Sequence, residues 1–227
     1  METNSALTGQ QSHQAKTSDD DSADNSSTTP LFDDIINSPA KFISDTSFHL
    51  LRATSFAAFK HGCQTRKNAR RSAYIEHPLG VAHLLRTIGN VSDVDTLCAA
   101  VLHDTLEDTN TTYDELKDMF GHNIAELVQR VTDNKSLSRK AQKLEQIKRA
   151  KVLPRPAKLI KLADKLYNLK ELFYDPPSTW DAQRRKDYIV FAACVVDNMR
   201  GTNSALEKEL DKVLALHGFP FEPASDS

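Results

Sequence analysis

The sequence predicts an all-α protein, and three observations support this prediction. The chain has only seven glycines in 227 residues, and no run of residues alternates between apolar and polar as a half-buried strand does. From about residue 45 onward, apolar side chains recur every three or four positions, which is the period of a helix. We therefore expect a single bundle of about eight to ten helices, since a chain of this length can bury one sizeable core.

Apolar faces and capping residues mark the helices of the first half of this bundle. Pro78 suits the first turn of a second helix, and Val94 begins a third that leads into His103. Thr112 with Glu115 resembles a capping box for a fourth helix, which would stop at Gly121. The first helix is expected to bury the face formed by Phe48, Leu51, Ser55, Ala58 and Phe59.

Prolines and caps divide the second half in the same way. A further apolar stripe runs from Ile124 to Val131, and a stretch rich in Lys and Arg follows at residues 138–151. Pro154 and Pro156 interrupt the chain and restart it as a helix that contains Asp164. Ser178 with Asp181 is expected to cap the next helix, and a last amphipathic helix should stop near Gly218.

The ends of the chain differ from its body in composition and charge. Residues 1–44 are polar and carry a net charge of −5, whereas the remainder carries +3. A segment with so few large apolar side chains cannot offset the entropy of ordering, so we expect a disordered acidic tail. The folded domain is predicted to span residues 45–219, with residues 220–227 as a short C-terminal tail.

Composition excludes several classes of protein. No apolar run reaches the ~18 residues of a membrane span, and the N-terminus has no apolar core of a signal peptide. The three cysteines, Cys63, Cys98 and Cys194, are too few and too scattered for a disulfide framework. We expect a cytoplasmic protein that does not contact membranes.

A short segment after the third predicted helix carries most of the chemistry. His103, Asp104, Glu107 and Asp108 directly follow the apolar run that ends at Leu102. On a helix, residues four apart share one side, so these groups can face one site. Buried charged groups are costly unless they are paired or bind a metal. The pattern therefore favours a metal site.

Two further ligands are predicted from distant helices. His77 precedes Pro78, which biases it towards an extended backbone at a helix start, and Asp164 interrupts an apolar run. Each residue also has a purely structural interpretation. His77 could cap a helix, and Asp164 could pair with Lys161 or Lys165.

Together these motifs resemble a known family. His77, His103-Asp104 and Asp164 have the order and types of the metal ligands in the HD superfamily of phosphohydrolases. The surrounding segments, residues 74–78, 102–109 and 161–169, resemble the hydrolase domain of the RelA/SpoT family, and the small metazoan members above all. The resemblance covers roughly residues 46–218 and implies a single HD-domain helical bundle.

The resemblance also implies a reaction. It implies one Mn²⁺ ion per chain, bound by His77, His103, Asp104 and Asp164, with Glu107 and Asp108 as catalytic acids. The implied substrate is guanosine 3′,5′-bis(diphosphate), or ppGpp, cleaved to GDP and pyrophosphate. From the residues alone, Fe²⁺ and Zn²⁺ remain open. The substrate-binding residues at matching positions are Lys67, Arg139, Asn168, Arg184 and Tyr188.

This sequence departs from the family at two points. The loop Asn68–Ala73 lacks the Gly and Pro that are common there, which bears on the position of Lys67. Arg139 stands where the animal members carry Lys, and the two side chains are not interchangeable at a shaped site.

Three other functions are compatible with parts of the sequence. An NADPH 2′-phosphatase would remove a phosphate beside a ribose by similar chemistry. A catalytically silent nucleotide-binding module would lack a ligand or a catalytic acid, yet all of them are present. Nucleic-acid binding is disfavoured, because aromatic residues are scarce in the basic segments. The sequence does not indicate the oligomeric state.

Overall fold

A computed structural model describes residues 46–219, and these form helices joined by short loops. The predictions for residues 1–44 and 220–227 lie outside the described residues. The only β pairing within residues 46–219 is an isolated bridge between Thr65 and Ala73, so the predicted all-α class is confirmed. The helices are α2 (Thr46–His61), α3 (Glu76–Thr87), α4 (Val94–Leu102), α5 (Thr105–Asp108), α6 (Tyr113–Phe120), α7 (His122–Val131), α8 (Arg139–Ala150), α9 (Arg155–Tyr174), α10 (Ala182–Asp197) and α11 (Ser204–Leu216).

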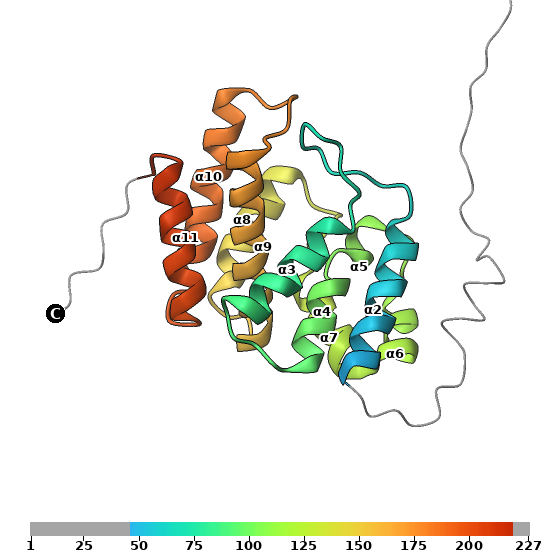
Figure 1. The fold of residues 1–227 in the computed structure, drawn as a ribbon. Helices are drawn as coiled ribbons and strands as arrows, with labels where there is room; N and C mark the ends of the chain where they lie inside the picture. The colour runs from blue at the N-terminus through green and yellow to red at the C-terminus, as the bar shows by residue number, and fades with distance from the viewer. Residues whose placement is uncertain (1–45, 220–227) are drawn as a thin grey trace, which may run out of the picture.

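Helix α9 is the central element of the bundle. It packs against α3, α4, α7, α10 and α11, so most of its circumference is buried (Figure 1). Figure 1 shows α10 and α11 on one side of it and α2 and α6 on the other. Pro156 lies in the first turn of α9, where a missing N–H costs no helical hydrogen bond. Asp164 and Lys165 lie in the middle of this buried helix, and such charges in a protein interior require partners.

Helix α4 leads into the functional segment. Its N-cap Asp93 accepts a hydrogen bond from the backbone N–H of Thr96, and every residue from Thr96 to Leu102 is buried. The helix ends at Leu102, and α5 begins at Thr105. His103 and Asp104 therefore lie at a break between two helices and not within one continuous helix. The break turns both side chains towards α3 and α9.

Close packing of α3 against α9 depends on Gly80. A Cβ atom at this position would lie 2.0 Å from Cε2 of Tyr167. The Tyr167 ring in turn packs edge-on against the imidazole of His77, with 4.9 Å between the ring centroids. Gly80 thus allows α3 to bring His77 close to α9.

Three further local predictions are wrong. Helix α2 buries Ala53, Phe56 and Ala57, while Leu51 is 66% exposed, because small side chains allow α2 to approach α4 closely. His77 is helical and not extended, since α3 begins at Glu76 and the first N–H groups of a helix have no internal partner for Pro78 to disrupt. Asp181 alone caps α10, whereas Ser178 lies three residues before the cap.

Other boundaries agree with the sequence. Thr112 caps α6 by accepting from the backbone N–H of Glu115, and Gly121 ends that helix with φ of 86°. Pro154 is the N-cap of α9, and α11 ends shortly before Gly218. Within residues 46–219, none of the helices combines the length and apolar character that crossing a bilayer requires.

Candidate active site

Four side chains from three segments converge beside α9. His77 comes from α3, His103 and Asp104 from the break after α4, and Asp164 from α9. Nε2 of His77 lies 3.3 Å from Oδ1 of Asp164 and 3.5 Å from Oδ2 of Asp104. Nε2 of His103 lies 3.1 Å from Oδ1 of Asp104 and 4.0 Å from Oδ1 of Asp164. Two ligands bound ~2.1 Å from one ion are about 3–3.5 Å apart, so these separations suit a shared cation.

His103 is oriented as a metal ligand is. Nδ1 of His103 lies 2.8 Å from the carbonyl oxygen of Ala100, which can only accept, so Nδ1 carries the proton. The lone pair of Nε2 then points into the cluster, where this buried atom has no hydrogen-bond partner. A backbone carbonyl that fixes the tautomer is the usual support of a ligating histidine. The residues present therefore fit a divalent cation.

The charges of the cluster also favour a cation. Burial lowers the pKa of His77, which keeps its imidazole neutral. Burial alone would lower the pKa of His103 as well, but the carboxylates of Asp104 and Asp164 outweigh it and raise that pKa. Burial opposes ionisation of Asp164, yet Lys165 and His77 hold the pKa of this carboxyl well below its usual range. Burial opposes ionisation of the part-buried Asp104 as well, but His103 and His77 hold its pKa well below the usual range. Both carboxylates thus stay ionised and attract a positive ligand.

Glu107 and Asp108 lie on α5, next to the cluster. The backbone N–H of Asp133 donates to Oε2 of Glu107 over 3.1 Å. Burial, and then the charge of Asp133, raise the pKa of Glu107. The hydroxyl of Tyr74 lies 2.7 Å from Oδ2 of Asp104 and 2.9 Å from Oδ2 of Asp108, so it links a candidate ligand to a candidate catalytic acid.

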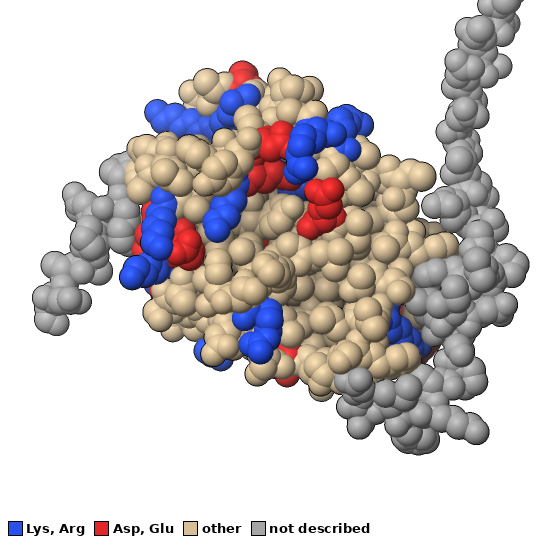
Figure 2. Space-filling view, viewed as in Figure 1, with Lys and Arg blue, Asp and Glu red and all other residues tan. Residues whose placement is uncertain are grey.

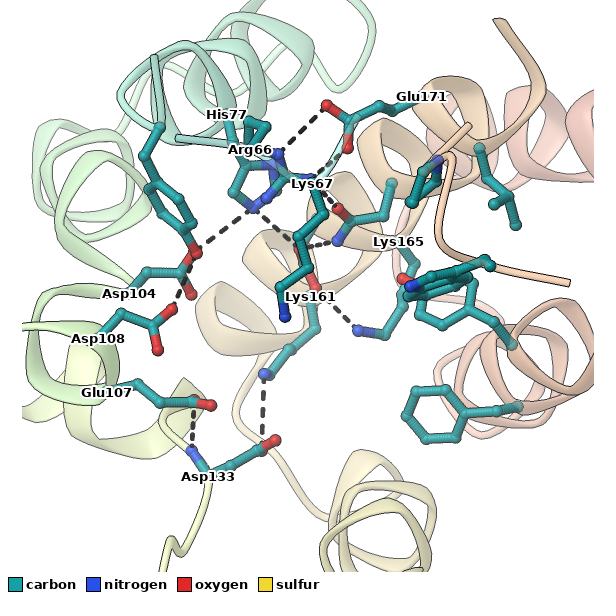
Figure 3. A pocket seen from close by; sticks show the side chains of 18 of the residues that line it. Arg66, Lys67, His77, Asp104, Glu107, Asp108, Asp133, Lys161, Lys165 and Glu171 are labelled. Atoms are coloured by element: carbon teal, nitrogen blue, oxygen red, sulfur yellow. Dashed lines mark hydrogen bonds and ion pairs between the residues drawn. The ribbon is translucent and has the colours of Figure 1, made fainter. Parts of the chain in front are cut away.

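These groups border a cavity of about 340 Å³ that opens to the surface. Figure 3 shows Asp104, Glu107 and Asp108 on one side of it and Lys161 and Lys165 across from them. Figure 2 shows acidic and basic side chains gathered around a hollow on this face of the protein. The apolar and aromatic part of the wall is formed by Leu172, Pro177, Trp180, Tyr188 and Phe191. A cavity with charges at one end and aromatic rings at the other suits a nucleotide.

The predicted substrate-binding residues differ in their positions. Lys67, Asn168 and Tyr188 line the cavity. Burial raises the pKa of Tyr188 to about 12, so its hydroxyl stays a neutral donor. Arg184 lies outside the cavity wall with its guanidinium 4.6 Å from the Trp180 ring centroid, and Arg139 is exposed at the start of α8.

Several lining residues were not assigned from the sequence. Arg66, Asp133, Lys161, Lys165 and Glu171 all reach the cavity. The sequence does indicate a role for Lys161 and Lys165, because these two lysines lie on either side of Asp164 in a largely apolar segment. Lys165 forms an ion pair with Asp164 at 2.8 Å. The structural interpretation of Asp164 as an ion-pair partner therefore holds together with its position in the metal cluster. Arg66 and Glu171 gave no local signal, since they are 105 residues apart.

Comparison with known proteins gives consistent matches. The sequence matches the HD domain family over residues 53–207. It is 45% identical over 169 residues to the guanosine-3′,5′-bis(diphosphate) 3′-pyrophosphohydrolase MESH1 of Danio rerio, a match that spans 74% of this chain and 94% of that protein. For the MESH1 of Homo sapiens the identity is 44% over the same shares of the two chains. A solved structure described as a metazoan ortholog of SpoT that hydrolyzes ppGpp superposes with a TM-score of 0.74 at 40% identity, covering 76% of this chain and 97% of the other.

Proposed function

This chain belongs to the HD domain family, and we propose that it hydrolyses ppGpp to GDP and pyrophosphate with the help of one Mn²⁺ ion. The observation that carries the proposal is the convergence of His77, His103 and Asp164, with Asp104 within 3.5 Å of both imidazoles. Glu107 and Asp108 line the cavity beside this cluster. The relatives named for this activity match over nearly their whole length, which supports the choice of substrate.

We assign the cation to His77, His103, Asp104 and Asp164. Two imidazoles and two carboxylates would suit Mn²⁺, which accepts oxygen and nitrogen ligands. When bound, such an ion lowers the pKa of a coordinated water and neutralises charge on a phosphoryl oxygen.

Glu107 and Asp108 are the candidates for moving the proton of the attacking water. The water oxygen forms a bond to the phosphorus attached to the ribose 3′ oxygen, and the bond from that phosphorus to the 3′ oxygen breaks. The water oxygen leaves with pyrophosphate, and the 3′ oxygen takes up a proton and stays on GDP. The raised pKa of Glu107 suits a group that accepts a proton in one step and returns it in the next.

Positive side chains across the cavity complete the site. Lys161 and Lys165 lie on the same face of α9, four residues apart, and both line the cavity. Lys67 reaches the cavity from the loop between α2 and α3. These charges can stabilise the negative oxygens of the transferring phosphoryl group. Asn168 and Tyr188 remain candidates for contacts to the nucleotide. Arg139 and Arg184 do not line the cavity, so their side chains would have to extend into it to contact the nucleotide.

The test is a direct assay with purified full-length protein. ppGpp and NADPH are supplied side by side with Mn²⁺, and products are identified by chromatography. We expect GDP and pyrophosphate from ppGpp at a rate well above phosphate release from NADPH. Cleavage of NADPH alone would make the chain a 2′-phosphatase, and ppGpp binding without turnover would make it a silent nucleotide-binding module.

The cytoplasm is the expected compartment, because Cys63, Cys98 and Cys194 are free thiols.

A further inference from the structure

The loop between α2 and α3 is a short, ordered hairpin. Thr65 and Ala73 form a β-bridge, and the backbone N–H of Arg66 donates to the carbonyl of Ser72 over 2.8 Å. At its tip, the side chain of Asn68 accepts from the N–H of Ser72 and donates to its hydroxyl. Internal hydrogen bonds thus replace the Gly and Pro that this loop lacks, and the hairpin holds Arg66 and Lys67 in a defined place.

Glu171 on α9 fastens this hairpin through Arg66. Nη2 of Arg66 lies 2.5 Å from Oε2 of Glu171, and Nε lies 3.2 Å from Oε1, which is a bidentate pair. The side chains are only 12% and 14% exposed, so water screens the pair weakly. Asn68 also donates to Oε1 of Glu171. In Figure 3, Arg66 lies between His77 and Glu171, with Lys67 beside it.

The same arginine is connected to the candidate metal cluster. Nη2 of Arg66 donates to Oδ1 of Asn168 over 2.7 Å, and Nδ2 of Asn168 donates to Oδ1 of Asp164 over 2.6 Å. The amide of Asn168 is therefore engaged at both ends. The Arg66 guanidinium also lies 5.5 Å from the Tyr74 ring centroid. A continuous set of contacts runs from Glu171 through Arg66 to Asn168.

We propose that Glu171 is a positioning residue for substrate binding: it fixes Arg66, and thereby sets the place of Lys67 over the cavity and the orientation of the Asn168 amide. This inference rests on the proposed function and deepens it. Glu171 need not touch the substrate. Without its carboxylate, Arg66 would be left buried without an ionised partner, and it would turn towards the acids of the cavity or towards solvent. Either movement removes the buried attachment of the hairpin to α9 and leaves the contacts of Asp175.

Kinetics of Glu171→Gln test this role. An interaction that holds a binding loop contributes equally to the ground state and the transition state, so its loss raises KM more than it lowers kcat. We expect KM for ppGpp to rise about tenfold or more with kcat within about threefold, as for loss of a charge-assisted pair. Bound Mn²⁺ should stay at the wild-type level. Glu171→Asp keeps the charge, and should recover part of the affinity.

Asp175 provides a matched control, because it is the C-cap of the same helix and contacts the same loop. It accepts from Arg70 over 2.8 Å and from the backbone N–H of Ala69, but the Arg70 side chain is 69% exposed. Exposed pairs contribute little, so Asp175→Asn should leave KM within about twofold of wild type. A comparable rise in KM for both variants would show that any contact of the hairpin matters, and would overturn the specific role of Glu171.

Hydrogen exchange tests the anchoring without any substrate. Peptides spanning residues 65–73 should exchange faster in Glu171→Gln, because the hairpin loses its buried attachment to α9. A folded Glu171→Gln protein with unchanged exchange and unchanged KM overturns the inference. Loss of Mn²⁺ together with kcat would also overturn it, since Glu171 would then support the metal ligands. Failure of the wild type to cleave ppGpp would refute the proposed function instead, while the exchange result would still decide the anchoring.

Discussion

The backbone N–H of Asp133 donates to the carboxylate of Glu107 across the rim of the cavity, over 3.1 Å. The Asp133 side chain faces Lys161 at 4.0 Å and also accepts from Gln146. Glu107 is therefore oriented by the backbone of Asp133 and repelled by its side-chain charge. These opposite influences are consistent with the raised pKa of Glu107, in which burial is the larger cause.

This relationship predicts the acid side of the pH–rate profile. A base works when it is deprotonated, so activity should fall as the pH drops through a pKa that lies above the ordinary 4.5 of a glutamate. Asp133→Asn removes the neighbouring negative charge and keeps the backbone donor. Its acid limb should therefore move to lower pH, as measured from kcat between about pH 4 and pH 8.

If the pH–rate profile of Asp133→Asn coincides with that of the wild type, the pKa of Glu107 does not determine the acid limb. Glu107→Gln is the companion variant. It should reduce kcat by about a hundredfold or more while Mn²⁺ stays bound, as for loss of a general base.

Asp164 is predicted to have two separable roles. Asp164→Asn should lose bound Mn²⁺ and turnover together, as metal analysis of the purified protein would show. It also leaves the buried Lys165 without its carboxylate, which should lower the free energy of unfolding by about 3 kcal/mol. Adding Lys165→Met should restore much of the stability without restoring the metal. The exposed Asp118→Asn serves as the neutral control.

We predict that replacing Gly80 destabilises the protein as long as Tyr167 is present. An alanine Cβ would lie 2.0 Å from the Tyr167 ring and force it against His77, so Gly80→Ala should cost about 1–3 kcal/mol of stability. Urea unfolding measures this cost. In a Tyr167→Leu background the substitution should cost much less, and an equal cost in both backgrounds would rule out the steric cause.

We predict that replacing Arg71 by glycine stabilises the protein. Its φ of 55° places it in the left-handed region, which costs a side chain with Cβ and suits glycine. Arg71→Gly should therefore raise the free energy of unfolding by up to about 1 kcal/mol. Arg70→Gly, one position earlier, lacks that strain and should be neutral or destabilising. The reverse order of the two stabilities would contradict the assignment of strain to Arg71.

Local patterns in the sequence predicted most of the fold, and together with the family resemblance they indicated the residues of the candidate site. His103 and Asp104 stand out because they follow a buried apolar run, and Asp164 stands out because it interrupts one. The pairing of Arg66 with Glu171 could not be predicted, because it depends on how a loop and a helix meet in three dimensions. The buried face of α2 was missed for a similar reason, since close packing against α4 favours Ala53 and Ala57 over larger neighbours.

Product identification before and after removal of metal tests the central claim most directly. We expect the full-length protein with Mn²⁺ to convert ppGpp to GDP and pyrophosphate, to lose that activity after exhaustive chelation, and to regain it when Mn²⁺ is returned. A preparation free of metal that still cleaves ppGpp at the full rate would contradict the role given to His77, His103, Asp104 and Asp164.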